Sequence, residues 1–127
     1  MGSITLFGIA GLPEIRPGDD LAGMIADAAS ADPATALRDG DVVVVTQKIV
    51  SKAEDRLVPV DPDDPLSHKP LVEAEAKRVL RRRGDLVITE THHGFICANS
   101  GIDLSNVERG WAALLPVDPD RSARRIR

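Results

Sequence analysis

The sequence predicts an α+β domain in which a small mixed sheet is flanked by helices. The β-branched run VVVVT at residues 42–46 is typical of a strand buried on both faces, and LVITET at 86–91 alternates as a half-buried strand does. Apolar residues recur at helical spacing after Asp19 and across residues 71–83. Because 127 residues leave room for one hydrophobic core, we expect a single domain over residues 1–127.

The first third of the chain is expected to hold a strand and a helix. ITLFGI at residues 4–9 has the composition of a short strand, and a loop rich in glycine and proline follows it. A helix is predicted to begin at Asp19, with acids in its first turn and Pro33 beyond its end. RDGD at 38–41 predicts a turn before the valine run.

The middle of the chain alternates between candidate helices and candidate strands. Residues 47–56 contain no glycine or proline, and can form either a turn or one turn of helix. LVPV at 57–60 is a candidate strand. For residues 71–83 we predict a helix that ends at Gly84. LVITET, a turn at 92–94 and the returning segment FICA together predict a hairpin.

The last part of the chain is expected to form a strand and then a helix. WAALLPV at 111–117 is the candidate strand. Asp118 is suited to cap the N-terminus of the helix, and Pro119 to occupy its first position. This helix reaches Arg127 without a capping residue, which favours a chain that is the N-terminal fragment of a longer domain.

Composition excludes several classes of partner. Aromatic residues make up 2% of the chain, too few for the base-stacking platform of a protein that binds single-stranded nucleic acid. The net charge of −4 disfavours binding to polyanions in general. No apolar stretch approaches the roughly 20 residues that span a bilayer. We therefore expect neither a nucleic acid nor a membrane partner.

Cysteine usage and the N-terminus favour a cytoplasmic protein. Cys97 is the only cysteine, so no intramolecular disulfide can form. Its place within FICA is typical of a small core residue. The N-terminus lacks the charged and then apolar regions of a signal peptide.

Two loops contain residues that suit either a plain structural role or a ligand. GLPEI at 11–15 is a rigid loop, which can also offer backbone N–H groups and Glu14 to a nucleotide base. Lys48 and Lys52 are four residues apart, so on a helical turn they share a face. They are either two solvated lysines or a phosphate-binding pair.

The stretch NSGIDLSN at 99–106 has the same ambiguity. Asp103 can cap a helical turn formed by the three residues after it. It can equally bind a hard cation, because Mg²⁺ and Mn²⁺ sites use one or two carboxylates and complete their shells with phosphate and water. Asn106 is then placed to bond a phosphate or ribose oxygen.

Five segments, taken in order, resemble the coenzyme F420-0:L-glutamate ligase family, the F420-0 gamma-glutamyl ligases. They are GLPEIRPGDDL, DGDVVVVTQKIVSKAEDRLV, EAEAKRV, ITETHHGFICANSGIDLSNV and LLPVDPDRSARRIR. Each is weak alone, but their order makes the resemblance specific over nearly the whole chain. It implies that the chain forms the N-terminal part of the gamma-glutamyl ligase fold.

The resemblance also implies an activity. The family joins L-glutamate to coenzyme F420-0 through γ-glutamyl amide bonds, using GTP and Mg or Mn, and a monovalent cation such as K is a further expected cofactor. The expected route activates the terminal carboxylate as an acyl phosphate, which the glutamate amine attacks. Such chemistry rests on positioning and charge neutralisation around the γ-phosphate, so no residue is assigned a catalytic role.

Site residues follow from the resemblance, position by position. Asp103 is implied as a ligand of the divalent metal. The implied GTP contacts are Leu12, Pro13, Glu14, Ile15, Gln47, Lys52 and Asn106. Gln47 stands where many relatives are expected to have a small hydroxyl residue, and Lys52 is the natural partner of a phosphate.

The chain departs from the family pattern in length. The family's chain continues for a comparable length and supplies further metal ligands there, and one carboxylate cannot complete such a site. The family's homodimeric state implies that this chain also forms a homodimer. The alternative to a ligase is a non-catalytic GTP-binding or scaffold fragment that needs a partner chain.

Overall fold

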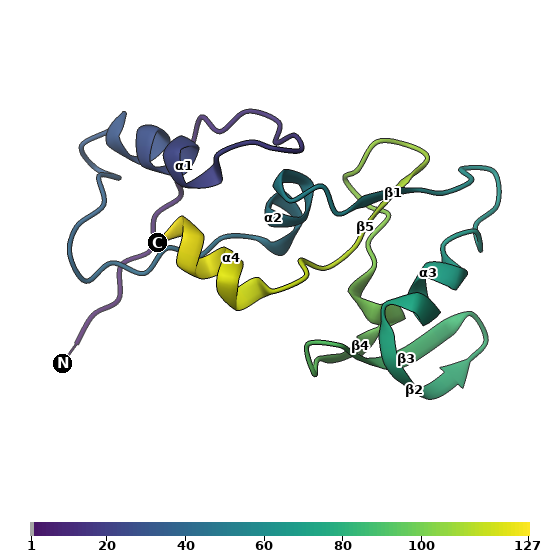
Figure 1. The fold of residues 1–127 in the computed structure, drawn as a ribbon. Helices are drawn as coiled ribbons and strands as arrows, with labels where there is room; N and C mark the ends of the chain where they lie inside the picture. The colour runs from purple at the N-terminus through teal and green to yellow at the C-terminus, as the bar shows by residue number, and fades with distance from the viewer. Residues whose placement is uncertain (1) are drawn as a thin grey trace.

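The computed structural model describes residues 2–127 and has the α+β composition predicted from the sequence (Figure 1). The elements are, in chain order, α1 Leu21–Ser30, α2 Gln47–Ala53, β1 Leu57–Pro59, α3 Lys69–Ala74, β2 Ala76–Arg83, β3 Leu86–Thr91, β4 Ile96–Ala98, the 3₁₀ turn η1 Asn99–Gly101, β5 Trp111–Ala113 and α4 Pro119–Ile126. No helix in the described part of the chain has the length and apolar character needed to cross a membrane.

Helices α1, α2 and α4 lie together at one end of the molecule (Figure 1). The sequence dictates α1 locally: the Asp20 side chain accepts from the backbone N–H of Gly23 at 3.2 Å and caps its N-terminus. Leu21 and Ile25 fall on the buried face of α1 and pack with Ile15 and other apolar side chains. This cluster holds α2 against the loop that precedes α1.

The strands form two small antiparallel sheets rather than the single mixed sheet expected. β1 pairs with β5, and this two-stranded ribbon leads from the helical end to the other sheet (Figure 1). β2, β3 and β4 form a meander whose inner face buries Thr89 and Thr91. The β3–β4 hairpin is where the alternating pattern and the turn at 92–94 predicted it.

The prediction of one helix over residues 71–83 is wrong. The chain forms the short helix α3 and then the strand β2, which pairs with β3. Arg83 pairs with Leu86 around a two-residue turn, and Gly84 adopts a positive φ of 56° there. A left-handed glycine serves a hairpin turn as well as a helix C-terminus, so Gly84 does not distinguish them. Cross-strand pairing outweighs the helix propensity of residues 76–83.

The predicted strands at residues 4–9 and 42–46 are also absent. Both segments run without regular secondary structure, and within residues 2–127 no strand pairs with either. Val42 and Val44 are 86% and 87% exposed, whereas the sequence predicted burial on both faces. Valine favours an extended backbone, but a strand exists only when a neighbour takes up its hydrogen bonds.

The remaining expectations are largely confirmed. Of residues 47–56, the part Gln47–Ala53 forms helix α2, the second of the two possibilities. Helix α4 begins at Pro119 with Asp118 as its cap, which accepts from Arg121 N–H at 2.9 Å. Residues 57–60 contain β1. The strand predicted over residues 111–117 extends only through β5, and α1 begins at Leu21 rather than Asp19, so its acids precede the first turn.

Candidate functional site

Helix α2 places two lysines where they contact two different loops. Lys48 and Lys52 lie four residues apart, one turn of helix, as the sequence predicted. The Lys52 side chain is only 11% exposed, and that of Lys48 is 20% exposed. Such burial restricts the ammonium groups to a few positions, so these are not freely solvated lysines.

Lys52 forms an ion pair with Glu14, 38 residues earlier in the chain. The Glu14 side chain is largely exposed, so the pair has one nearly buried partner and one exposed partner. The hydrogen bond from the Lys52 ammonium, and then its charge, hold the pKa of the Glu14 carboxyl below its usual range. The pair therefore holds the Lys52 ammonium against the exposed Glu14 carboxylate.

Lys48 contacts the other loop. Its Nζ lies 2.6 Å from Asp103 Oδ2 and also donates to the backbone oxygen of Ser105 at 2.6 Å. Burial raises the pKa of the Asp103 carboxyl, but hydrogen bonds from Lys48 and Ser105 outweigh it and keep the pKa below its usual range. The sequence predicted that Lys48 shares a helix face with Lys52, but it did not predict the pairing of Lys48 with Asp103.

Asp103 closes a turn rather than capping a helix. Its Oδ1 accepts from the backbone N–H and from the hydroxyl of Ser105, both at 2.7 Å. No helix follows within the described residues; the chain turns at Ser105 and Asn106 instead. Asn106 is exposed and has a φ of 53°, a conformation that asparagine tolerates better than most residues. The helix-cap interpretation of Asp103 is therefore wrong, and the turn leaves Oδ2 for Lys48.

The ionisation of Asp103 gives a testable pH dependence. A pKa lowered by folding adds stability above the pKa of the unfolded chain, about 3.9 for aspartate, and that stability is lost as the pH falls through the lower folded value. We expect Asp103→Asn to lose less stability than the wild type between about pH 6 and pH 3 in urea unfolding. Asp63→Asn, which breaks an exposed pair with Arg109, is the matched control; an equal effect there would contradict the assignment.

The loop at residues 12–15 is anchored by its last residue. Ile15 is 5% exposed and belongs to the core cluster, and Leu12 packs against that cluster from its edge. Pro13 and Glu14 are exposed. Within residues 2–127, no protein acceptor is recorded for the backbone N–H groups of Leu12, Glu14 and Ile15. The loop therefore presents unsatisfied donors beside the Lys52 ion pair.

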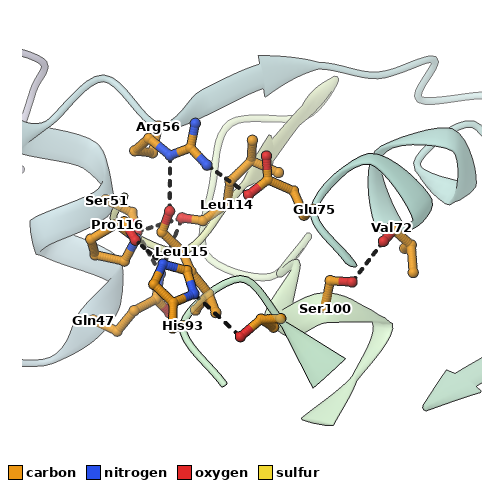
Figure 2. A network of polar contacts seen from close by, with 11 residues as sticks. Gln47, Ser51, Arg56, Val72, Glu75, His93, Ser100, Leu114, Leu115 and Pro116 are labelled. Atoms are coloured by element: carbon orange, nitrogen blue, oxygen red, sulfur yellow. Dashed lines mark hydrogen bonds and ion pairs between the residues drawn. The ribbon is translucent and has the colours of Figure 1, made fainter. Parts of the chain in front are cut away.

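Gln47 is occupied by contacts within the protein. As Figure 2 shows, it lies beside Ser51 and the backbone of Leu114. Gln47 Nε2 is 2.5 Å from Ser51 Oγ, which in turn donates to Leu114 O at 2.6 Å. These bonds attach α2 to the segment after β5. The predicted contact of Gln47 with GTP stays a prediction.

The next two carbonyls of that segment are held in the same way (Figure 2). Arg56 Nε donates to Leu115 O at 2.8 Å, while its Nη2 pairs with Glu75 Oε2 at 2.7 Å. His93 Nε2 lies 2.7 Å from Pro116 O, which requires the tautomer with a proton on Nε2. Side chains from several elements thus take the place of a neighbouring strand along this segment.

The chain reaches Asp103 through a left-handed turn. Asn99, Ser100 and Gly101 have φ values of 48°, 55° and 71°. Only glycine adopts this region freely, and other residues pay roughly 1–2 kcal/mol each. The strained backbone requires compensating contacts, because a conformation of this cost persists only where the surroundings impose it.

The metal expected at Asp103 must draw most of its ligands from elsewhere. No group of three or more His, Cys, Asp or Glu side chains converges within residues 2–127. Asp103 offers one carboxylate, a suitable hard donor, but Oδ2 is paired with Lys48. The residues present therefore fit a cation as a single ligand, with phosphate, water or other protein oxygens completing the shell.

Other reactive or concave features lie outside this site. Burial raises the pKa of the Cys97 thiol, as expected for a core cysteine and not for a nucleophile. A cleft of about 1080 Å³ is bordered by residues 37–45, Phe95 and α4. Of the residues predicted to bind ligands, only Gln47 lines it. Glu14 and Lys52 instead face each other, and Asp103 faces Lys48.

The fold and the paired lysines describe an α+β protein with a candidate anion site, and comparison with known proteins gives its family. The family described as F420-0:Gamma-glutamyl ligase matches residues 10–127. The coenzyme F420:L-glutamate ligase of Methanothermobacter thermautotrophicus is 39% identical over 97% of this chain and 54% of its own length. Those of Methanopyrus kandleri and Halorubrum lacusprofundi are 38% and 40% identical, over 100% and 98% of this chain and 55% of each relative.

The chain therefore belongs to the F420-0:gamma-glutamyl ligase family, as its sequence motifs suggested. It spans about half the length of the curated relatives that it matches. The structure brings Glu14 to Lys52 on one side of α2 and Asp103 to Lys48 on the same helix. It places Asn106 at the tip of the adjacent turn and Gln47 in an internal network.

Proposed function

We propose that this chain supplies part of the GTP- and divalent-metal-dependent site of a ligase that adds L-glutamate to coenzyme F420-0 through γ-glutamyl bonds. The observation that carries the proposal is the arrangement on α2. Lys52 and Lys48 bring together the loop at 12–15 and the turn at Asp103, the two segments whose motifs match the family. The names of the relatives support the ligase activity.

In this proposal, Lys52 is the phosphate-binding residue. Its ammonium is nearly buried and is paired with an exposed carboxylate, so a phosphate can take the place of Glu14 without opening the core. The N–H groups of the 12–15 loop are suited to donating hydrogen bonds to oxygens of the nucleotide base. The γ-phosphate is then transferred to the terminal carboxylate of F420-0, and the glutamate amine displaces phosphate from that acyl phosphate.

Asp103 is the proposed metal ligand on this chain. Asp103 Oδ2 exchanges Lys48 for the cation, and Asn106 lies where its amide can contact a bound nucleotide. Bound Mg²⁺ or Mn²⁺ supplies charge neutralisation at the phosphates. Lys48, when released, remains on the same helical turn as Lys52 and adds positive charge next to the phosphates.

We also propose that two copies of the chain associate as a homodimer in the cytoplasm, and that K⁺ acts as a further cofactor. The exposed valines at residues 42–44 support the association. A non-catalytic GTP-binding or scaffold role is the second candidate, favoured by the single carboxylate at the metal position. Binding of GTP and Mn²⁺ without release of GDP in the presence of F420-0 and glutamate would select it.

Titration with Mn²⁺ in the presence of GTP tests the assignment of Asp103. Paramagnetic broadening of amide NMR signals reports where the ion binds, and it should begin at residues 103–106. We expect Asp103→Asn to weaken this binding at least roughly tenfold, because it removes the only carboxylate at the position. Asp63→Asn is the matched control. Unchanged Mn²⁺ affinity in Asp103→Asn would remove the metal from the proposal.

A further inference from the structure

The left-handed turn at residues 99–101 is held by side chains that the proposed site does not itself use. Ser100 is the central residue of the turn, with φ 55° and ψ 23°, and it is 1% exposed. A buried, non-glycine residue in this conformation is rare. Strained backbone of this kind clusters where a protein fixes functional groups.

Ser100 is anchored to two separate elements. Its hydroxyl donates to Val72 O in α3 at 2.6 Å, a bond visible in Figure 2. Its backbone N–H donates to Thr89 Oγ1 in β3 at 3.0 Å. Val72 and Thr89 are both fully buried. The serine therefore uses its side chain and its main chain to fix the turn against the sheet and the helix beneath it.

The residues on either side of Ser100 are fixed as well. Asn99 Oδ1 accepts from Val87 N–H at 3.2 Å and from Lys69 Nζ at 3.3 Å. Gly101 has no room for a side chain, because a Cβ there would lie 2.9 Å from Leu115 Cδ1. The turn is thus enclosed between the β2–β4 sheet and the segment that follows β5, and its direction is determined.

Only Ile102 separates the turn from Asp103, so the path of the turn sets where Asp103 lies. After Gly101 the chain becomes extended at Ile102, with φ −67° and ψ 130°. Asp103 then makes both backbone hydrogen bonds with Ala113, N–H to O at 3.0 Å and O to N–H at 2.8 Å. The turn thus ends two residues before the residue that pairs with both Ala113 and Lys48.

We propose that Ser100 is a positioning residue for Asp103: its buried hydroxyl holds the left-handed turn that directs the carboxylate toward α2. The backbone part of the inference stands on the contacts alone. Its consequence for cation binding rests on the proposed function. A plain core hydroxyl would need no left-handed backbone, since a buried serine satisfies its hydrogen bond from an ordinary conformation just as well.

Two substitutions separate positioning from stability. Ser100→Ala removes the hydroxyl and keeps the strained φ, whereas Ser100→Gly removes the hydroxyl and relieves the strain. We expect glycine to restore much of the stability that alanine loses. If Ser100 positions Asp103, neither variant restores the backbone pairing of Asp103 with Ala113. If Ser100 is only a core residue, Ser100→Gly should restore both the stability and the backbone pairing of Asp103 with Ala113.

Amide hydrogen exchange without metal is the first measurement. We expect the Asp103 and Ala113 amides to exchange roughly tenfold faster in both Ser100 variants, as loss of one buried hydrogen bond would produce. The Ser122 amide of α4, which bonds to Asp118 O away from the turn, is the reference and should rise less than the Asp103 and Ala113 amides. Ser122→Ala, which removes another buried hydroxyl, is the matched control. Unchanged exchange at Asp103 in the Ser100 variants, or an equal rise at Ser122, would overturn the inference.

Mn²⁺ affinity is the second measurement, by the same amide broadening in the full chain with GTP. Loss of a residue that orients a ligand weakens metal binding roughly tenfold, and we expect this for both Ser100 variants but not for Ser122→Ala. If Asp103→Asn has no effect on Mn²⁺, the metal proposal fails while the exchange result still decides the role of Ser100. If Asp103→Asn weakens binding and the Ser100 variants do not, Ser100 is not a positioning residue for the ligand.

Discussion

A Lys52→Ala variant is expected to bind GTP roughly tenfold to a hundredfold more weakly than the wild type. A hydrogen bond to a charged group contributes about 1.5–3 kcal/mol, and each 1.4 kcal/mol is about a factor of ten in affinity. We expect Lys52 to contribute a free energy in this range because its ammonium is nearly buried and already held in place. Little side-chain entropy is then lost when a phosphate binds.

The variant should remain folded. Its former partner, Glu14, is 74% exposed at the side chain, so water can solvate the unpaired carboxylate. Isothermal titration with GTP and Mn²⁺ measures the change in affinity, and thermal unfolding verifies the fold. Lys77→Ala is the matched control, since Lys77 is an exposed lysine on β2 that also pairs with a glutamate.

Glu14→Gln gives an independent view of the same pair. If Glu14 only holds Lys52, removing its charge leaves the ammonium free for phosphate, and GTP affinity should stay equal or rise. If Glu14 contacts the nucleotide base, affinity should fall. A Lys52→Ala variant that binds GTP as tightly as the wild type would remove Lys52 from the site whatever Glu14 does.

Features set by neighbouring residues were predicted well from the sequence. The cap of α4 depends on Asp118, whose side chain accepts from the backbone N–H of Arg121, three residues later. The β3–β4 hairpin depends on alternation and on Gly94, which has the positive φ of a turn residue. These patterns are local, so the amino-acid order contains them directly.

Features set by distant contacts were predicted poorly. Residues 76–83 have helix-forming side chains but pair with β3, and nothing in the segment itself reveals that partner. Residues 42–46 have the pattern of a buried strand, yet no strand of the described chain reaches them. In both cases the decisive interaction comes from outside the segment.

In the candidate site, too, local features were predicted from the sequence and distant contacts were not. Spacing alone put Lys48 and Lys52 on one face of a helix. Their partners could not be found that way, since Glu14 lies 38 residues before Lys52 and Ser105 lies 57 residues after Lys48. The left-handed conformation of Ser100 was missed for another reason: serine rarely adopts it, so a sequence pattern gives it no weight. The adjacent glycine was the only available signal.

If the proposed homodimer forms through residues 42–46, a Val42→Lys/Val44→Lys double variant is expected to dissociate at least roughly a hundredfold more readily than the wild type. The two valines are exposed, while Val45 packs against the core. Unpaired extended segments associate through their backbone edges and apolar faces. Full burial of one valine contributes about 1.5–3 kcal/mol, so losing two such contacts corresponds to about two factors of ten or more in the dissociation constant.

The substitution acts on association and leaves the folded monomer intact, because both side chains already face solvent. Lysine on an exposed edge also opposes strand pairing by charge and by its hydration. Sedimentation velocity over a range of concentrations measures the dissociation constant. Amide exchange should show residues 42–46 protected in the associated wild type and unprotected in the double variant.

The control is Val117→Lys, which introduces one of the two added charges at an exposed valine outside the run. If it weakens association as much as the double variant, the cause is net charge rather than the 42–46 segment, and these valines do not form the interface. A second comparison uses Ile4 and Leu6, which are 91% and 89% exposed. Should their replacement by lysine dissociate the dimer while the Val42 and Val44 changes do not, the N-terminal segment is the contact. A wild type that stays monomeric at all concentrations would contradict the homodimer itself.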